Sequence, residues 1–193
     1  MPNRDVLKRV SKAIVGFFAG LAFWWGISAP YHRIVAPPAE MILRATETPS
    51  VTRLEPREME IIVNRDDFPV RSARPGVPMF DLTFNVILLF ALFSASRETF
   101  SNRNVIGFLA ACALLYVSHV GALIVTVKSI YAMKLGAWST ANYGAVARNV
   151  WAGTEHFYRV VGLYGIAFAL WWILRPEGVA LRLRGNRTRQ RRR

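Results

Sequence analysis

Apolar residues gather into four long stretches along the chain, at residues 13–35, 79–96, 105–127 and 157–174. A membrane-spanning helix needs roughly 20 mainly apolar residues, and the second and fourth stretches are near the short end of that length. One such stretch is compatible with a buried helix of a soluble protein. Four of them in 193 residues predict an all-α integral membrane protein, a bundle of four transmembrane helices.

The first stretch also has features of a secretory signal peptide, because basic residues precede its apolar run. However, the bulky Trp24 and Trp25 lie close to the small residues of the cleavage region, and Pro30 follows Ala29, the best cleavage point. Paired tryptophans suit the interface between membrane and water. The sequence therefore favours an uncleaved anchor over a cleaved leader.

Residues 36–78 form the only sizeable polar insert. The first helix is expected to continue from Tyr31 to Arg44 and to break around Pro37-Pro38. Two β-like runs, residues 51–54 and 59–63, then predict a small β-hairpin.

Residues 70–78 contain two prolines and a glycine, which predicts an extended linker into the second span. A lone hairpin is marginally stable in water, so we expect the hairpin to pack against the membrane domain or against a partner.

The net charge of +13 has three possible explanations: nucleic acid, a membrane surface, or a topology signal. The tail 1–12 carries four basic residues and one acidic residue, and the tail 175–193 carries eight and one. The insert is acidic overall, and the turn 97–104 is short and basic. Because basic segments stay on the cytoplasmic side, this distribution predicts an inner-membrane protein with both termini in the cytoplasm.

The polybasic tail 175–193 is expected to lie against anionic lipid headgroups. No aromatic platform accompanies it, so the sequence argues against a nucleic-acid partner. The second outer loop, residues 128–156, is rich in aromatic residues: Tyr131, Trp138, Tyr143 and Trp151. Such a loop is typical of an amphipathic segment anchored in the membrane interface, with a groove for a lipid or peptide as the alternative.

Polar groups inside or beside membrane spans are costly and therefore informative. Glu155, His156 and Arg159 form the most suggestive local cluster, in which His156 would act as the acid–base group. Asp81 and His119 complete the set of candidate catalytic residues.

Cys112 lies about 10 Å along the helix from His119, which is too far for a base to activate a thiol. His119, His156 and Asp81 have no metal-ligand spacing, so neither a metal nor a cofactor is expected. Gly16 and Gly20 form a small-xxx-small face for helix packing.

The order of these pieces resembles the membrane core of the exosortase and archaeosortase family. Five segments carry the resemblance: Tyr31 to Leu43 (YHRIVAPPAEMIL), Phe80 to Ala95, Asn102-Arg103-Asn104, Tyr116 to Ile130, and Glu155-His156 followed by the helix ending in Leu170-Trp171-Trp172. The resemblance implies a catalytic Cys, Arg and His at the outer ends of the spans.

The chain departs from this family at two of the three catalytic positions. No Cys lies near Asp81, and no Arg lies between Tyr116 and Val127. Only His156 matches. Without the thiolate and its activating cation the sortase reaction lacks its nucleophile.

The sequence therefore favours a non-catalytic, exosortase-like accessory protein of envelope protein sorting or surface assembly, which holds a membrane or exterior protein partner. A divergent membrane enzyme around His156 and a structural subunit of a larger membrane complex are the alternatives.

Overall fold

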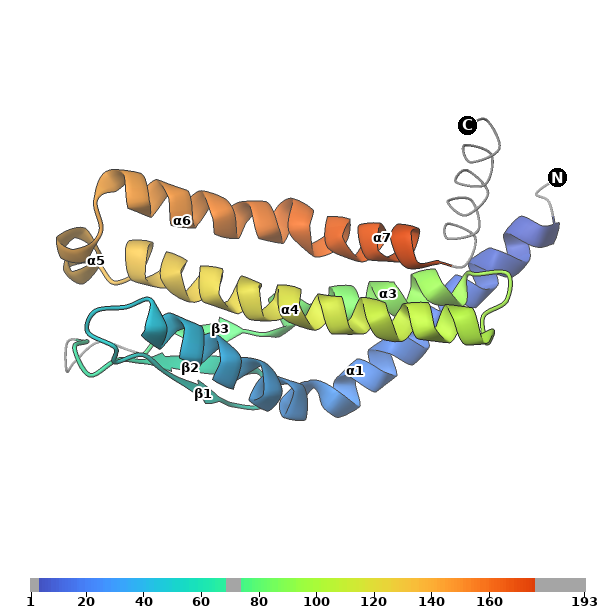
Figure 1. Ribbon diagram of the computed structural model, residues 1–193, viewed down its shortest axis with the longest axis horizontal. Helices are drawn as coiled ribbons and strands as arrows, with labels where there is room; N and C mark the ends of the chain where they lie inside the picture. Colours follow the sequence, from blue (N-terminus) through green and yellow to red (C-terminus); the bar gives the residue numbers. More distant parts are fainter. Residues whose placement is uncertain (1–3, 69–73, 176–193) are drawn as a thin grey trace, which may run out of the picture. The chain divides into compact units, whose positions relative to one another are not determined.

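A computed structural model describes residues 4–68 and 74–175 of the chain (Figure 1). Most of the polybasic tail, residues 176–193, lies outside the described residues, and so does part of the predicted linker, residues 69–73. The elements in chain order are α1 (Arg4–Ala45), β1 (Arg53–Pro56), β2 (Glu60–Asn64), β3 (Gly76–Pro78), α2 (Phe80–Thr83), α3 (Asn85–Ser94), α4 (Asn102–Met133), α5 (Ala137–Asn142), α6 (Ala145–Phe157), the π-helical turn η1 (Tyr158–Gly162) and α7 (Leu163–Leu174).

Three helices are long and apolar enough to cross a membrane: Arg4–Ala45, Asn102–Met133 and the continuous run Ala145–Leu174. This agrees with the prediction of a helical membrane protein, but four spans are not established. The predicted second span, 79–96, folds as the shorter apolar helical run Phe80–Ser94. At 1.5 Å per residue these 15 residues rise about 22 Å, short of the roughly 30 Å hydrocarbon layer.

The described residues form two compact units, and the first contains residues 4–24, 85–115 and 164–175. Its described part is held together by close helix contacts. A Cβ atom on Gly16 would lie 2.8 Å from the carbonyl oxygen of Phe90, and one on Gly20 would lie 2.8 Å from the Cβ of Phe90. The Phe90 ring packs on Phe23 and Phe108, with ring centroids 5.2 and 4.8 Å apart. The Gly16/Gly20 face of α1 is therefore the surface on which α3 packs.

The second unit, residues 25–84 and 116–163, contains an antiparallel sheet in the order β1-β2-β3. Leu54 pairs with Val63, and Ile61 pairs with Val77. These side chains are almost fully buried against apolar residues from the second half of α1 and from α4. Figure 1 shows β1 to β3 beside that half of α1. The sheet thus shares one apolar core with two helices and does not depend on a hairpin alone.

Two details of the polar insert differ from the sequence-based prediction. The sheet has a third strand, β3, where an extended linker was expected. In addition, α1 does not break at Pro37-Pro38 but continues to Ala45 with three internal prolines. A proline removes one backbone hydrogen bond and disfavours a helix. Here the helix continues because its flanking side chains Val35 and Ala39 are fully buried in the shared core.

The predicted outer loop, 128–156, is largely helical, because it contains the end of α4, all of α5 and most of α6. Tyr131 is fully buried, so it is a core residue of the second unit and not an interfacial anchor. Its ring packs on Phe68 and Trp138, with centroids 5.8 and 5.9 Å away. An aromatic-rich sequence between two spans does not distinguish such a cluster from a membrane belt.

The packing of α1 on α3 gives a test of the fold. Gly16→Ala is expected to lower the free energy of unfolding by about 1–3 kcal/mol, because the added methyl group meets backbone and forces the helices apart. Gly26→Ala is the matched control, since nothing lies within 4 Å of a Cβ at that position of α1. The control is expected to be neutral or stabilising, because alanine is the better helix former. Unfolding in mixed detergent micelles measures both. Equal effects would contradict the packing.

Candidate functional site

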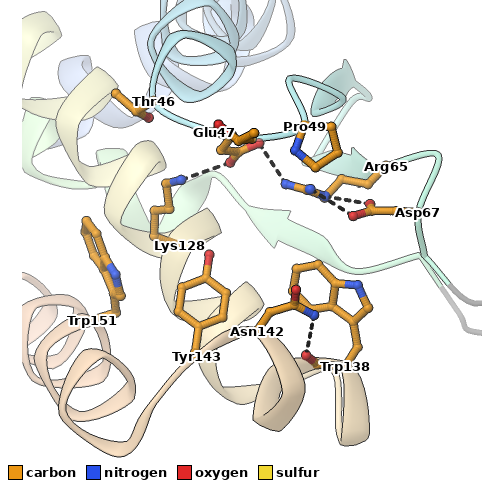
Figure 2. A pocket seen from close by; sticks show the side chains of 11 residues that line it. Thr46, Glu47, Pro49, Arg65, Asp67, Lys128, Trp138, Asn142, Tyr143 and Trp151 are labelled. Carbon is orange, nitrogen blue, oxygen red and sulfur yellow. Dashed lines mark hydrogen bonds and ion pairs between the residues drawn. The ribbon is translucent and has the colours of Figure 1, made fainter.

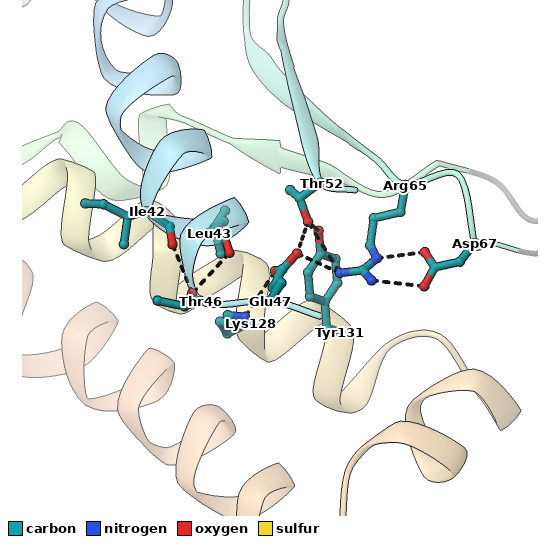
Figure 3. Close-up of polar contacts among 9 residues, drawn as sticks. All are labelled: Ile42, Leu43, Thr46, Glu47, Thr52, Arg65, Asp67, Lys128 and Tyr131. Carbon is teal, nitrogen blue, oxygen red and sulfur yellow. Dashed lines mark hydrogen bonds and ion pairs between the residues drawn. The ribbon is translucent and has the colours of Figure 1, made fainter. Parts of the chain in front are cut away.

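Three chain segments of the second unit meet around the carboxylate of Glu47. Glu47 follows the C-terminus of α1, where the Thr46 hydroxyl donates to the carbonyl oxygens of Ile42 and Leu43 at 3.0 and 3.1 Å. Arg65 follows β2, and Lys128 lies in the last turns of α4. The end of a helix, the end of a strand and a second helix therefore supply the charged groups (Figure 3).

The Glu47 carboxylate is bound on both oxygens. Its Oε2 accepts a hydrogen bond from Arg65 Nη1 at 2.7 Å, and its Oε1 accepts one from Lys128 Nζ at 3.0 Å. The Thr52 hydroxyl also donates to Oε2 and lies 2.8 Å from the Tyr131 hydroxyl. The side chains of Glu47 and Arg65 are each 5% exposed, and that of Lys128 is 10% exposed. Burial of such charges is tolerated only when they are paired and hydrogen-bonded, as they are here.

Arg65 is held from several directions. Its guanidinium donates to both oxygens of Asp67, at 2.8 and 2.9 Å, and lies 5.0 Å from the Tyr131 ring centroid and 5.4 Å from that of Trp138. Burial works to lower the pKa of Arg65, but the hydrogen bond to Asp67 and the charge of Glu47 outweigh it and raise that pKa. The hydrogen bond from Arg65 in turn lowers the pKa of Asp67. Both groups therefore carry their charges at neutral pH.

These charges form one wall of a pocket of about 320 Å³ (Figure 2). Trp138, Tyr143 and Trp151 supply aromatic surface, and Asn142 adds an amide that donates to the Trp138 carbonyl at 2.8 Å. Burial raises the pKa of Tyr143, so its phenol stays protonated. The volume of the pocket is at the small end of the range typical of ligand pockets. The pocket offers aromatic faces and fixed polar groups.

The arrangement suits binding better than proton transfer. An acid–base group needs a proton-accepting site within reach of a substrate. Here both oxygens of Glu47, the more deeply buried of the network's two carboxylates, are occupied by donors from the protein itself. The network therefore fixes the shape and charge of the pocket wall.

The structure brings together three of the candidate residues named from the sequence. Arg159 Nη2 lies 3.0 Å from Glu155 Oε1, and Arg159 Nη1 lies 3.4 Å from Asp81 Oδ2. Lys134 Nζ is 4.0 Å from the same Glu155 oxygen. Asp81, Glu155 and Arg159 thus form an ion-pair cluster between α2 and the middle of the helical run Ala145–Leu174.

The two histidines do not join that cluster. His156 is exposed, and its side chain makes no hydrogen bond or ion pair within residues 4–68 and 74–175. His119 is fully buried, and its Nδ1 lies 2.6 Å from the Tyr31 hydroxyl. In the part of the chain that the structure describes, no group of three potential metal ligands occurs.

Sequence reasoning missed the Glu47 network. Glu47 and Lys128 are 81 residues apart in the chain, so no short spacing motif links them. One signal was present: Lys128 directly follows the third apolar stretch, where a charge is costly unless a partner neutralises it.

The network gives a test of the site's energetics. Glu47→Ala is expected to lower the free energy of unfolding by about 3–5 kcal/mol, because it leaves two buried cations without their shared carboxylate. Arg44→Ala is the control, since Arg44 is 49% exposed and pairs with Glu40 only at 3.7 Å. Its loss is expected to cost about 0–1 kcal/mol. Denaturant unfolding in micelles measures both. A small loss for Glu47→Ala would show that this pairing does not hold the unit together.

Comparisons with protein-family models, with curated proteins and with solved structures found no match to this chain.

Proposed function

We propose that this chain is a multi-pass inner-membrane protein that acts as a non-catalytic exosortase-like or exosortase-associated accessory factor. It holds a membrane or exterior protein partner during envelope protein sorting or surface assembly. The proposal is carried by one observation: Arg65, Lys128 and Thr52 all donate to the buried Glu47 carboxylate, beside an aromatic-lined pocket. A pre-organised polar and aromatic surface is the usual anatomy of a recognition site.

Contacts within the first unit support a topology with both termini in the cytoplasm. Lys12 Nζ donates to the carbonyl oxygens of Ser96 and Arg97 at 3.4 and 3.1 Å. The turn after α3 therefore lies beside the N-terminal end of α1. A Cβ on Gly107 would meet the carbonyl oxygen of Leu174 at 2.5 Å, which brings the end of α7 to the start of α4. The two tails and the turn 97–104 are all basic, as expected of one cytoplasmic side.

Cysteine labelling tests this topology. In a Cys112→Ala background, Met59→Cys and Phe100→Cys each introduce a single thiol at a position that is 72% and 92% exposed. A membrane-impermeant maleimide is expected to label the Met59 variant in intact cells and the Phe100 variant only after permeabilisation. The background alone serves as the unlabelled control. Labelling of the Phe100 variant in intact cells would mean that residues 79–96 do not cross the membrane.

Partner capture tests the function. The tagged full chain, extracted from native membranes in mild detergent, is expected to carry a stoichiometric protein partner. Trp151→Ala is expected to reduce the retained partner at least tenfold, equivalent to about 1.4 kcal/mol, because it removes an aromatic wall of the pocket. His156→Ala is expected to retain the partner and to leave cellular function intact.

Two other outcomes would each favour an alternative. Loss of function in His156→Ala with the partner still bound would argue for a divergent enzyme. A permanent assembly that Trp151→Ala leaves unchanged would argue for a structural subunit of a larger membrane complex. The matched control is Trp25→Ala, which changes a tryptophan that is 83% exposed and lies outside the pocket.

A further inference from the structure

A second, chemically different pocket lies at the N-terminal end of the first unit. It measures about 380 Å³ and is lined by one face of α1 and by the turn after α3. Its residues are Asp5, Lys8, Arg9, Lys12, Ser96 and Arg97. The two walls are joined by Lys12, whose ammonium group donates to the Ser96 and Arg97 carbonyls. The pocket is therefore formed by two elements and is not a mere run of charges along one helix.

The pocket has four cations and one carboxylate, a surplus of three positive charges. Lys8 and Lys12 are four residues apart and lie on the same side of α1, so their charges add at one place. Arg9 and Arg97 supply planar guanidinium groups, which bind phosphate through two parallel hydrogen bonds. This composition is suited to a phosphate-bearing ligand.

Apolar surface begins directly beside these charges. Val15, one turn beyond Lys12 on α1, is 68% exposed, and Phe18 is 62% exposed. Both belong to the part of α1 that is apolar enough to cross a membrane. A ligand that places a phosphate at Lys8 and Arg9 and continues along α1 therefore meets hydrocarbon side chains. A nucleic acid or an acidic peptide would gain nothing from them.

We infer that this pocket binds the phosphate headgroup of one anionic phospholipid, with an acyl chain along the apolar face of α1. Basic pockets between membrane helices on the cytoplasmic side recognise such headgroups. The site differs from the polybasic C-terminal tail, because it is built from α1 and the turn after α3. The pocket lies at the end of α1 that the proposed topology places in the cytoplasm, and its binding of lipid does not depend on the proposed protein partner.

Native mass spectrometry of the purified full chain tests the site. In micelles containing equal amounts of phosphatidylglycerol and phosphatidylcholine, the chain is expected to retain phosphatidylglycerol in preference. The triple variant Lys8→Gln, Arg9→Gln and Arg97→Gln is expected to lower that affinity at least tenfold. Lys12 is left unchanged because it ties the two walls together. The matched control, Arg44→Gln, Arg53→Gln and Lys134→Gln, removes the same charge elsewhere and is expected to retain the lipid.

A gain-of-affinity variant guards against a folding artefact. Asp5→Asn removes the only carboxylate among the described residues that line the pocket. It is expected to raise phosphatidylglycerol affinity about two- to fivefold, since the repulsion between two like charges about 4–8 Å apart in water has this magnitude. Inorganic phosphate at millimolar concentration is expected not to displace the lipid. Equal lipid loss in both triple variants, no gain with Asp5→Asn, or full displacement by inorganic phosphate would each overturn the inference.

Discussion

The burial of one carboxylate between two cations organises the second unit. Glu47 lies just beyond the end of α1, and Arg65 and Lys128 approach it from the sheet and from α4. Each charge is costly to remove from water, and only the pairing offsets that cost. The three segments must therefore assemble together. The same contacts fix the position of Trp138, whose ring faces the Arg65 guanidinium. The shape of the pocket thus follows from an electrostatic requirement as well as from apolar packing.

The first unit is organised by close packing and not by charge. Gly16 and Gly20 let α1 approach α3 until backbone and side-chain atoms of Phe90 are in contact. Small residues at such positions are typical of helices that associate within a bilayer, where apolar burial gives little driving force. The polar contacts of this unit lie at its end, where Lys12 reaches the turn after α3. Apolar contacts between the helices and charged groups at the helix ends are the arrangement expected of helices in a bilayer.

Charge pairing also bears on chemistry. Two sets of ionisable groups are paired internally: those of the Glu47 network, and the cluster of Asp81, Glu155 and Arg159. His156 is exposed and His119 is buried against Tyr31. An acid–base reaction needs a group placed near its substrate with a matched pKa. This distribution supports the proposal of a recognition role.

The sequence by itself determined which parts of the chain are apolar and helical, three of them long enough to cross a membrane, and it indicated two of the three strands. These are local properties, because the hydrophobic pattern of neighbouring residues indicates both the length of a helix and the alternation of a strand. The tertiary structure alone decided that α1 continues through Pro37-Pro38, that β3 joins the sheet and that Tyr131 is a core residue. It also decided that Glu47, Arg65 and Lys128 meet. Each of these depends on partners far away in the chain, and a single sequence does not record which distant residues come into contact.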